Sequence, residues 1–418
     1  MRNFFIIIIL FVVFSCQTQE PVEIEKMTTE QWEYDINYVN KKIQREFASY
    51  DPNVKVNFDK NAKKLIQQLG TLDAETIAIE IGRLLASLED GHTEMSILQE
   101  NANLSRLPIA SYFFKEGLYI FAAHKKHKDL VGSQILTIGD DSIPQVVEKL
   151  KDVMTYDNIY EIYQTGPSFI SLPSVLQYLK ISEKDSVGLT LKTLSNDTVR
   201  VHMSPVPRSE YGKGPWERYS TIHQLKTQLR DQNSDKNYWY EYLPDQKTMY
   251  FYYGRVNNQK GQKTIKKTVN EMFEIIDKVQ PEKFVVDLRD NRGGNYNKSI
   301  PLIKALKKRD FLNKKGKVYV ISGRTTFSAA LVTSIFFKKQ TNAILIGEPS
   351  RGHPNKTDNV EYMYLPNSQL KIEYTTKVKK HWPELGTSDH LPVDIRITPS
   401  FKYYQQGKDE VLEYILQQ

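Results

Sequence analysis

The stretch VYVISGRTTFSAALVTSIFF, residues 318–337, decides the fold class of this chain. Its first part is a run of apolar, mostly β-branched residues, which is typical of a strand buried on both faces. A polar turn with Gly323 follows, and the rest is largely apolar, which predicts a buried helix. Ser328 lies where the turn should become the helix. It is therefore either a helix cap or a nucleophile at the positive end of that helix.

The sequence on both sides of this stretch repeats the alternation of strand and helix. An amphipathic helix is predicted around residues 265–276 and another around 299–308. Further strands are predicted at TMYFYYG, KFVVDLR and AILIGE, residues 248–254, 283–289 and 343–348. Strands that alternate with helices predict βαβ units around a parallel sheet. Residues 237–418 are therefore expected to form an α/β domain.

Residues 28–103 are predicted to form a small helical domain. Thr28 and Gln31 have the spacing of a capping box, and Asp73 can open a later helix. A helix between them is expected at residues 58–69. The first helix would present one apolar face made of Trp32, Ile36, Val39, Ile43 and Phe47.

The middle of the chain has a different pattern. Residues 104–206 contain short alternating runs such as PIASYFF, GLYIFAA and SQILTIG, which predict a small β-rich domain. Residues 207–236 are polar with a Gly-Pro break and are expected to be a linker. Residues 17–27 are expected to be a tether.

The N-terminus has the pattern of a bacterial lipoprotein signal. Arg2 precedes an apolar run, residues 4–14, which is too short to cross a bilayer that needs about 20 residues. Ser15 and Cys16 follow, and this pair resembles a lipoprotein processing site. We therefore expect residues 1–16 to be a lipoprotein signal peptide whose Cys16 becomes lipidated. The alternative is an uncleaved anchor with a chance cysteine.

Composition excludes several classes of function. The chain has 418 residues, 40% of them apolar and 26% charged, which is ordinary for a globular protein. The net charge is +7, but the basic residues are scattered, whereas nucleic-acid binding favours a basic stripe. Cys16 is the only cysteine, so a disulfide within the chain is excluded. No Gly-rich phosphate-binding motif occurs.

Two other stretches could carry chemistry. VVDLRDNRGGNY, residues 285–296, leaves a predicted strand and turns at Gly293 and Gly294. Paired glycines allow backbone N–H groups to approach a ligand, although a tight turn alone would also explain them. LEDGHTEM, residues 88–95, places His92 after a helix, and a lone loop histidine is more often merely solvated.

Together these stretches resemble motifs of the tail-specific, or C-terminal-processing, serine peptidase family. The segments DLRDNRGGN, TTFSAA and ILIGEPSRG occur in the family's order, and the resemblance extends over roughly residues 238–412. It implies a crotonase-like (ClpP/crotonase) catalytic domain in which Ser328 is the nucleophile. The oxyanion hole would then consist of backbone N–H groups of Gly293, Gly294 and Ala329. Residues 117–150 resemble the PDZ-like domain that many members carry.

The general base departs from the commonest family pattern. In the bacterial tail-specific branch the base is a lysine 25 residues after the serine, a position that His353 occupies here, with Lys356 three residues later. The branch that includes tricorn and the chlamydial protease-like activity factor instead uses a histidine from the N-terminal part. EDGHT resembles its motif, so His92 is the expected base and His353 the alternative. Asp389, with Glu384 behind it, is the expected orienting acid.

The resemblance implies a lipid-anchored serine endopeptidase outside the cytoplasm of a bacterium, in the periplasm or on the outer membrane. Its substrate would be a protein or peptide, and it would need no cofactor or metal. A second hypothesis is a catalytically inactive lipoprotein that retains the peptidase fold and binds peptides or glycans. A third is an acyl-CoA enzyme of the crotonase-like fold, which the secretion signal disfavours. The oligomeric state and the substrate stay open.

Overall fold

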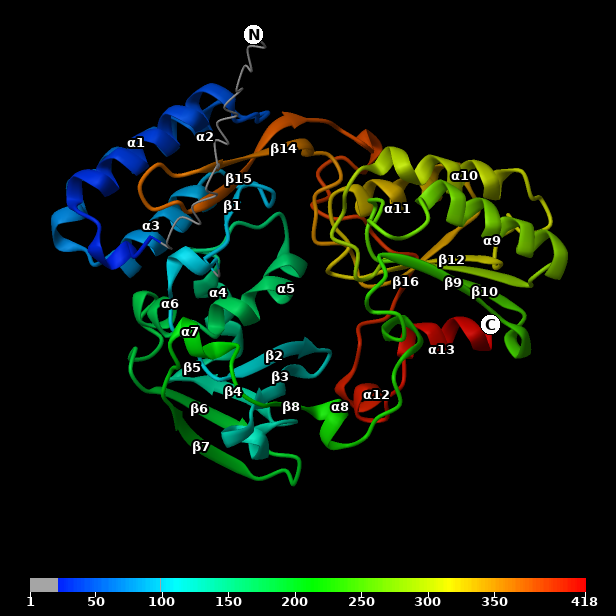
Figure 1. Cartoon of the computed structure of the whole chain (residues 1–418), viewed down its shortest axis with the longest axis horizontal. Coiled ribbons are helices and arrows are strands. Elements are labelled where there is room, and N and C mark those ends of the chain that lie inside the picture. The colour runs from blue at the N-terminus through cyan, green and yellow to red at the C-terminus, as the bar shows by residue number, and fades with distance from the viewer. Residues whose placement is uncertain (1–21, 98) are drawn as a thin grey trace, which may run out of the picture.

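A computed structural model describes residues 22–97 and 99–418, and shows two lobes joined by several crossing segments (Figure 1). The predictions for the signal peptide and for Cys16 lie outside the described residues. The fold is mixed α/β with several sheets, as expected, although the sheets are distributed over both lobes.

One lobe is built on a six-stranded sheet of order β16-β13-β12-β11-β10-β9. Strands β10 to β13 and β16 run parallel, and β9 pairs antiparallel with β10 at one edge. The strands are β9 (Tyr238–Leu243), β10 (Thr248–Tyr253), β11 (Lys283–Asp287), β12 (Val318–Ser322), β13 (Ile344–Gly347) and β16 (Ile395–Arg396). The predicted parallel sheet is thereby confirmed.

Helices cover both faces of this sheet, which explains why its strands are apolar without alternation. On one face lie α9 (Ile265–Val279), α10 (Ile300–Lys307) and α11 (Ala329–Gln340), which pack on side chains such as Val286 and Val320. The C-terminal helix α13 (Glu410–Gln417) covers the other face and packs on Val285 and Ile321.

The second lobe contains the N-terminal helices and an antiparallel sheet. The path of this sheet is β2-β3-β4-β6-β7, with β5 paired to β4 and β8 to β3. The strands are β2 (Ile109–Phe114), β3 (Gly117–His124), β4 (Gln134–Ile138), β5 (Asp141–Ser142), β6 (Val187–Lys192), β7 (Thr198–Met203) and β8 (Trp216–Arg218). The helices are α1 (Thr29–Glu46), α2 (Asn53–Gln68), α3 (Ala74–Ala86), α4 (Ile143–Leu150), α5 (Ile159–Ile170), α6 (Pro173–Tyr178), α7 (Arg208–Tyr211) and α8 (Tyr219–Ile222).

The starts of the N-terminal helices follow local capping chemistry. Thr28 and Gln31 form the predicted capping box, and the Asp73 side chain accepts a hydrogen bond from the backbone N–H of Thr76. Helix α2 begins at Asn53, earlier than predicted, because Asp51 Oδ1 accepts the Asn53 N–H at 2.8 Å and so supports an earlier first turn.

A long hairpin connects the two lobes. It consists of β14 (Thr357–Tyr364) and β15 (Lys371–Val378), and it extends from the parallel-sheet lobe to the N-terminal helices (Figure 1). There β15 pairs with the short strand β1 (Glu94–Met95). Buried Asp35 of α1 accepts the N–H groups of Asn367 and Ser368, at 2.9 and 2.8 Å, at the hairpin tip. The hairpin therefore places late residues beside the segment that carries His92.

Candidate active site

Ser328 lies between β12 and α11 in a strained backbone conformation. Its φ of 54° and ψ of −123° are unusual for a residue with a side chain. Although Ser328 is the N-cap of α11, its side chain makes no capping hydrogen bond. The hydroxyl is therefore not used as a cap, and strain of this kind is often found at functional sites.

The turn that carries Ser328 is hydrogen-bonded to the neighbouring turn, which follows β11. Thr326 Oγ1 donates to the carbonyl of Leu288 at 2.8 Å, and the N–H of Phe327 donates to the carbonyl of Asn291 at 3.0 Å. The two turns lie at the carboxyl ends of adjacent parallel strands, β11 and β12. This is the edge at which parallel sheets bind ligands.

The predicted oxyanion glycines lie on that neighbouring turn, against Ser328. A Cβ at Gly293 would lie 2.8 Å from Ser328 Cβ and 3.1 Å from the backbone nitrogen of Ala329, so a larger residue would clash. Gly293 and Gly294 also have φ of 108° and 138°, which favours glycine. The Gly293 N–H already donates to Asn291 Oδ1 at 2.8 Å.

Ser328 faces a cavity of about 460 Å³ that the sequence analysis did not predict. Its other wall includes Asp358, Lys377 and His381, from the hairpin and the loop after it. His381 is mostly buried, and its Nε2 lies 3.4 Å from Asp358 Oδ1. Sequence reasoning missed this pair because neither residue lies in a motif and only the hairpin brings them near Ser328.

The expected base, His92, is buried next to the nucleophile turn. Its ring stacks on Phe327, with ring centroids 3.9 Å apart and an interplanar angle of 19°. Among the described residues, neither ring nitrogen has a hydrogen-bond partner. His92 is thus adjacent to the residue before Ser328, but the structure contains no His92–Ser328 hydrogen bond.

Acidic residues surround this histidine. Buried Asp90 Oδ2 accepts hydrogen bonds from the hydroxyls of Thr93 and Thr375, at 2.5 and 2.6 Å. Burial lowers the pKa of His92, while the negative charges of Asp90 and Asp157 oppose that shift. The imidazole therefore favours its neutral form, which is the form that can accept a proton.

The alternative base, His353, is tied to the same region. Its Nδ1 accepts the N–H of Asn355 at 3.0 Å, and its own N–H donates to Asp157 Oδ2 at 3.1 Å. Burial lowers the pKa of His353 as well. Lys356 Nζ lies 3.3 Å from Asp157 Oδ1 and also bonds the carbonyl of Glu89. Neither His353 nor His92 is among the described residues that line the Ser328 cavity.

The structure does not bring the expected acid to His92. The Asp389 side chain is half exposed and lies 2.6 Å from His390 Nδ1. Glu384 is more exposed and pairs with Lys339 at 3.3 Å. The charged groups that act on His92 come from other segments, because the loop after β15 turns toward solvent at these positions.

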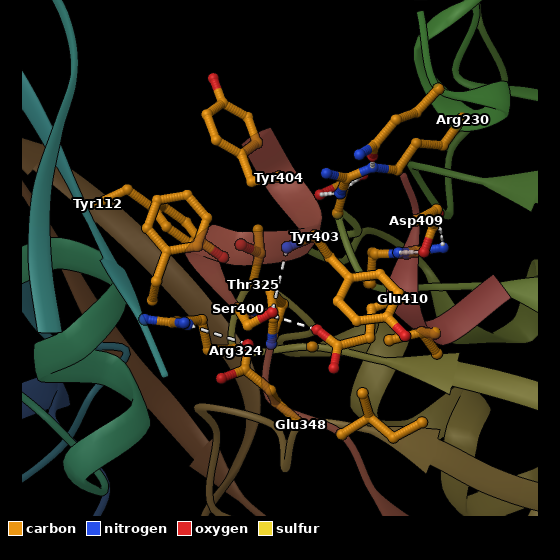
Figure 2. Close-up of a pocket in the computed structure, with 18 of the residues that line it drawn as sticks. Tyr112, Arg230, Arg324, Thr325, Glu348, Ser400, Tyr403, Tyr404, Asp409 and Glu410 are labelled. Atoms are coloured by element: carbon orange, nitrogen blue, oxygen red, sulfur yellow. Dashed lines mark hydrogen bonds and ion pairs between the residues drawn. The ribbon is translucent and has the colours of Figure 1, made fainter. Parts of the chain in front are cut away.

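A second cavity, of about 380 Å³, lies between the lobes at the carboxyl ends of the parallel strands (Figure 2). Arg324 spans it, since its guanidinium bonds Glu348 in one lobe at 3.1 Å and the carbonyl of Phe113 in the other at 2.6 Å. The same guanidinium lies 4.7 Å from the ring centroid of Tyr112. Further walls come from α12 (Phe401–Gln405), which supplies Tyr403 and Tyr404.

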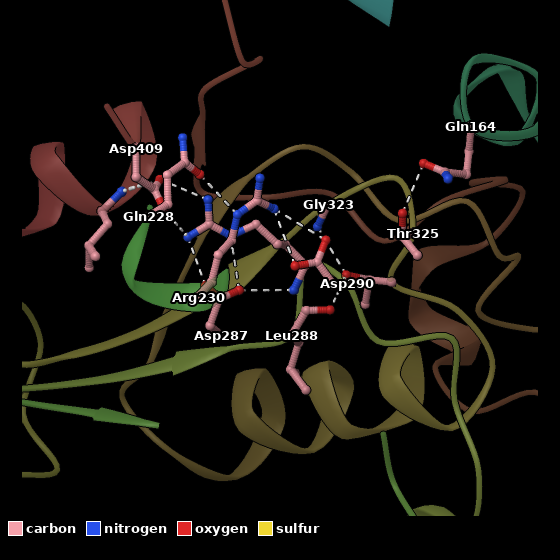
Figure 3. A network of polar contacts seen from close by, with 12 residues as sticks. Gln164, Gln228, Arg230, Asp287, Leu288, Asp290, Gly323, Thr325 and Asp409 are labelled. Atoms are coloured by element: carbon pink, nitrogen blue, oxygen red, sulfur yellow. Dashed lines mark hydrogen bonds and ion pairs between the residues drawn. The ribbon is translucent and has the colours of Figure 1, made fainter. Parts of the chain in front are cut away.

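A buried charge network supports the turn that carries the glycines (Figure 3). Arg289 lies 2.7 Å from a carboxylate oxygen of Asp287 and 2.7 Å from one of Asp409. Burial opposes its charge, but these two carboxylates raise the pKa of Arg289 well above its ordinary value. Next to it, Arg230 pairs with Asp290 at 3.2 Å. The network fastens the end of β11 to the start of α13.

The described residues contain neither a candidate metal-binding cluster nor a candidate membrane-spanning helix. Within residues 22–97 and 99–418, no cluster of three or more histidine, cysteine, aspartate or glutamate side chains could hold a metal ion. No helix in the same ranges is both long enough and apolar enough to cross a membrane.

The arrangement of elements can be compared with known proteins. No protein-family model matches this sequence, and no curated protein does. A structure of mature CPAF complexed with lactacystin matches with a TM-score of 0.60 and 10% sequence identity, over 93% of this chain and 97% of that chain. Another structure of mature CPAF matches with a TM-score of 0.58 and 11% identity, over 93% and 96%. The resemblance inferred from the motifs is thus confirmed at the level of the fold: over 93% of its length this chain has the fold of mature CPAF.

Proposed function

We propose that this protein is a serine endopeptidase that hydrolyses peptide bonds with Ser328 as the nucleophile. The observation that carries the proposal is the conformation of Ser328, which is strained, packed against Gly293 and free of any capping bond at the start of a buried helix. The fold shared with mature CPAF supports it, because the order of the sequence motifs independently indicated a serine peptidase.

In the proposed reaction, Ser328 Oγ attacks the scissile carbonyl while a histidine removes its proton. The tetrahedral oxygen would accept hydrogen bonds from the N–H groups of Ala329 and Gly294, at the positive end of α11. Removing one such donor typically costs about 3–4 kcal/mol of transition-state stabilisation. Gly293 would mainly supply space, since its N–H is engaged by Asn291.

His92 is the proposed base. Burial favours the neutral form of its imidazole. The ring stacks on Phe327, the residue that precedes Ser328 in the sequence, and this contact holds His92 close to the nucleophile turn. Catalytic hydrogen bonds are often long before substrate binds, so we propose that substrate binding completes the contact between His92 and Ser328. His353 remains an alternative base, and His381 becomes another because it shares the cavity with Ser328.

A fluorophosphonate probe and an unfolded protein substrate test the proposal together. We expect the probe to label the wild-type protein and not Ser328→Ala, and cleavage to be lost in the same variant. Absence of both labelling and cleavage in the wild type would favour the inactive binding protein instead. His92→Ala, His353→Ala and His381→Ala identify the base, and full activity of His92→Ala would exclude our assignment.

The remaining details belong to the same proposal. We propose a crotonase-like catalytic domain at residues 237–418, a PDZ-like domain at 104–206, and a lipid anchor on Cys16 that holds the protein outside the cytoplasm of a bacterium. Incorporation of labelled palmitate should be lost in Cys16→Ser, together with recovery in the membrane fraction. Labelling that persists in Cys16→Ser would exclude this anchor.

A further inference from the structure

We propose that Asp157, a residue from the middle of the chain, is the positioning carboxylate for His92. This inference rests on the proposed function, and it assigns to Asp157 the orienting role that the sequence suggested for Asp389. The carboxylate would hold the His92 loop in place and stabilise the positive charge that the ring acquires when it takes the proton of Ser328.

The contacts of Asp157 support this role. Its side chain is fully buried, and Oδ1 accepts the N–H of Gly91, the residue before His92, at 3.2 Å. A Cβ at position 91 would clash with Glu161 Oε2 and lie 2.9 Å from Asp157 Oδ2, so glycine is what allows both carboxyl groups to approach this loop. The Oδ2 atom accepts the N–H of His353 at 3.1 Å. Asp157 therefore joins the loops of both candidate bases.

Lys356 completes the arrangement. Its ammonium lies 3.3 Å from Asp157 Oδ1 and bonds the carbonyl of Glu89, three residues before His92. Lys356 thus balances the charge of Asp157 and fastens the same loop. This gives a function to a lysine that lies close to the family's usual base position but whose Nζ here bonds Asp157 and Glu89 instead.

Local chemistry fixes Asp157 independently of His92. Its backbone N–H donates to Glu161 Oε2 at 2.8 Å, within the first turn of α5. The next residue, Asn158, is the N-cap of α5, and its side chain donates to the carbonyls of Ser350 and Asp389. The carboxylate is therefore presented from a rigid helix start.

The charges facing His92 come from four segments. Asp90 lies on its own loop, Asp157 precedes α5, Arg351 follows β13 and Glu373 lies on β15. Asp90 is already held by two threonine hydroxyls. Burial raises the pKa of Asp157, but Lys356 and His92 lower it below its ordinary value, so this carboxylate is ionised at neutral pH.

Two substitutions test the inference, because one removes a negative charge near His92 and the other removes a positive charge, so they should shift the pKa of His92 in opposite directions. In Asp157→Asn the negative charge is lost at constant shape, so the pKa of His92 should fall and the acidic limb of kcat/KM should move to lower pH. We expect kcat to fall at least about tenfold with KM for a peptide little changed. In Lys356→Gln the counter-charge is lost, so the acidic limb should move to higher pH. Asp389→Asn, an exposed carboxylate, is the matched control and should leave the profile unmoved.

The outcomes separate this inference from the proposed function. A wild-type protein without Ser328-dependent cleavage would overturn the proposed function itself. An active wild type whose Asp157→Asn variant keeps its kcat and pH profile would overturn only the role of Asp157. A purely structural role would lower activity in both variants without opposite shifts. If Asp157→Asn does not fold, as judged by circular dichroism, an unmoved profile in Lys356→Gln overturns the inference.

Discussion

Ser328 has a backbone conformation that glycine would adopt at lower cost. With φ of 54° and ψ of −123°, the backbone of a residue that carries a Cβ is strained by about 1–3 kcal/mol. Glycine would relieve this strain, but part of the gain in stability would be offset because glycine makes the unfolded chain more flexible. We expect Ser328→Gly to be more stable to urea than Ser328→Ala by about 1 kcal/mol, and neither variant should cleave substrate if Ser328 is the nucleophile as proposed. Equal stability of the two variants would mean that the site stores no strain.

Burial of His92 should make the fold sensitive to acid. Because burial lowers the pKa of His92, the folded protein binds fewer protons there than the unfolded chain, whose histidine titrates near about 6.5. The free energy of unfolding should therefore decline as pH falls below about 6.5. We expect this decline, measured with urea at about pH 7.5 and 5.5, to be smaller in His92→Gln. The exposed His202 provides the control, and His202→Gln should retain the wild-type slope.

The turn between β11 and α10 requires glycine at position 293 for two reasons: its φ is positive, and Ser328 leaves no room for a Cβ. Gly293→Ala should reduce both activity and stability, because its Cβ would lie 2.8 Å from Ser328 Cβ. Gly316→Ala is the matched control: its φ is also positive, at 82°, but no atom lies within 4 Å of the added Cβ. We expect about 1 kcal/mol of destabilisation in the control, with full peptidase activity. Equal effects of the two substitutions would contradict a role for the contact with Ser328.

Helix α13 should depend on one buried arginine. In Arg289→Gln, Asp287 and Asp409 lose their cation while remaining buried, which typically costs about 3–5 kcal/mol. Hydrogen exchange should then show early opening of α13. The exposed pair Lys247–Glu282 is the control, and Lys247→Gln should leave stability nearly unchanged because solvent screens this pair. A similar loss in both variants would mean that the network does not dock α13.

At the scale of elements, the sequence predicted what depends on local pattern. The apolar runs of β11, β12 and β13 and the capping box of Thr28 and Gln31 were sufficient, because both patterns depend on residues close together in sequence. The hairpin β14–β15 was missed. Its two strands contain few apolar residues and show no clear alternation of buried and exposed positions in the sequence. Three of its larger apolar side chains, Val360, Tyr362 and Tyr364, are exposed. It is held by β1, by Asp35 and by the core of the N-terminal lobe, in which Met363, Ile372 and Tyr374 are buried, and all of these partners are distant in sequence.

The two lobes should be held together by the hairpin tip. Asp35 accepts three hydrogen bonds there, the third from Asn367 Nδ2 at 3.0 Å. We expect Asp35→Ala to lower stability by about 3 kcal/mol and to expose residues 365–370 to proteolysis, mapped by mass spectrometry. Glu33→Ala, on the exposed side of the same helix, should leave the digestion pattern unchanged. An uncut tip in Asp35→Ala would show that β1 pairing alone suffices.

At the scale of the whole molecule, the sequence predicted that Ser328 and the two glycines lie together, but it did not predict what surrounds His92. Those residues lie on the turns that follow two adjacent strands of one sheet, so topology alone brings them together. The surroundings of His92 depend on three distant segments, and no local pattern distinguishes buried Asp157 from exposed Asp389. The domain boundaries and the PDZ-like assignment stay predictions.

The hairpin β14–β15 also determines when, during synthesis of the chain, the loop around His92 can acquire its neighbours. Strand β1 acquires its neighbour β15 only when residues 371–378 exist, and Asp157 acquires Lys356 scarcely earlier. The N-terminal helices can form on the growing chain, but the loop that holds His92 stays incomplete until nearly the entire polypeptide has been made. A ribosome-stalled or truncated chain that ends before residue 357 would therefore contain Ser328 and His92 but lack the strand β15 that pairs with β1 beside the His92 loop. If Ser328 and His92 act as proposed, peptidase activity should appear only after the hairpin has been synthesised, which a series of C-terminal truncations would check.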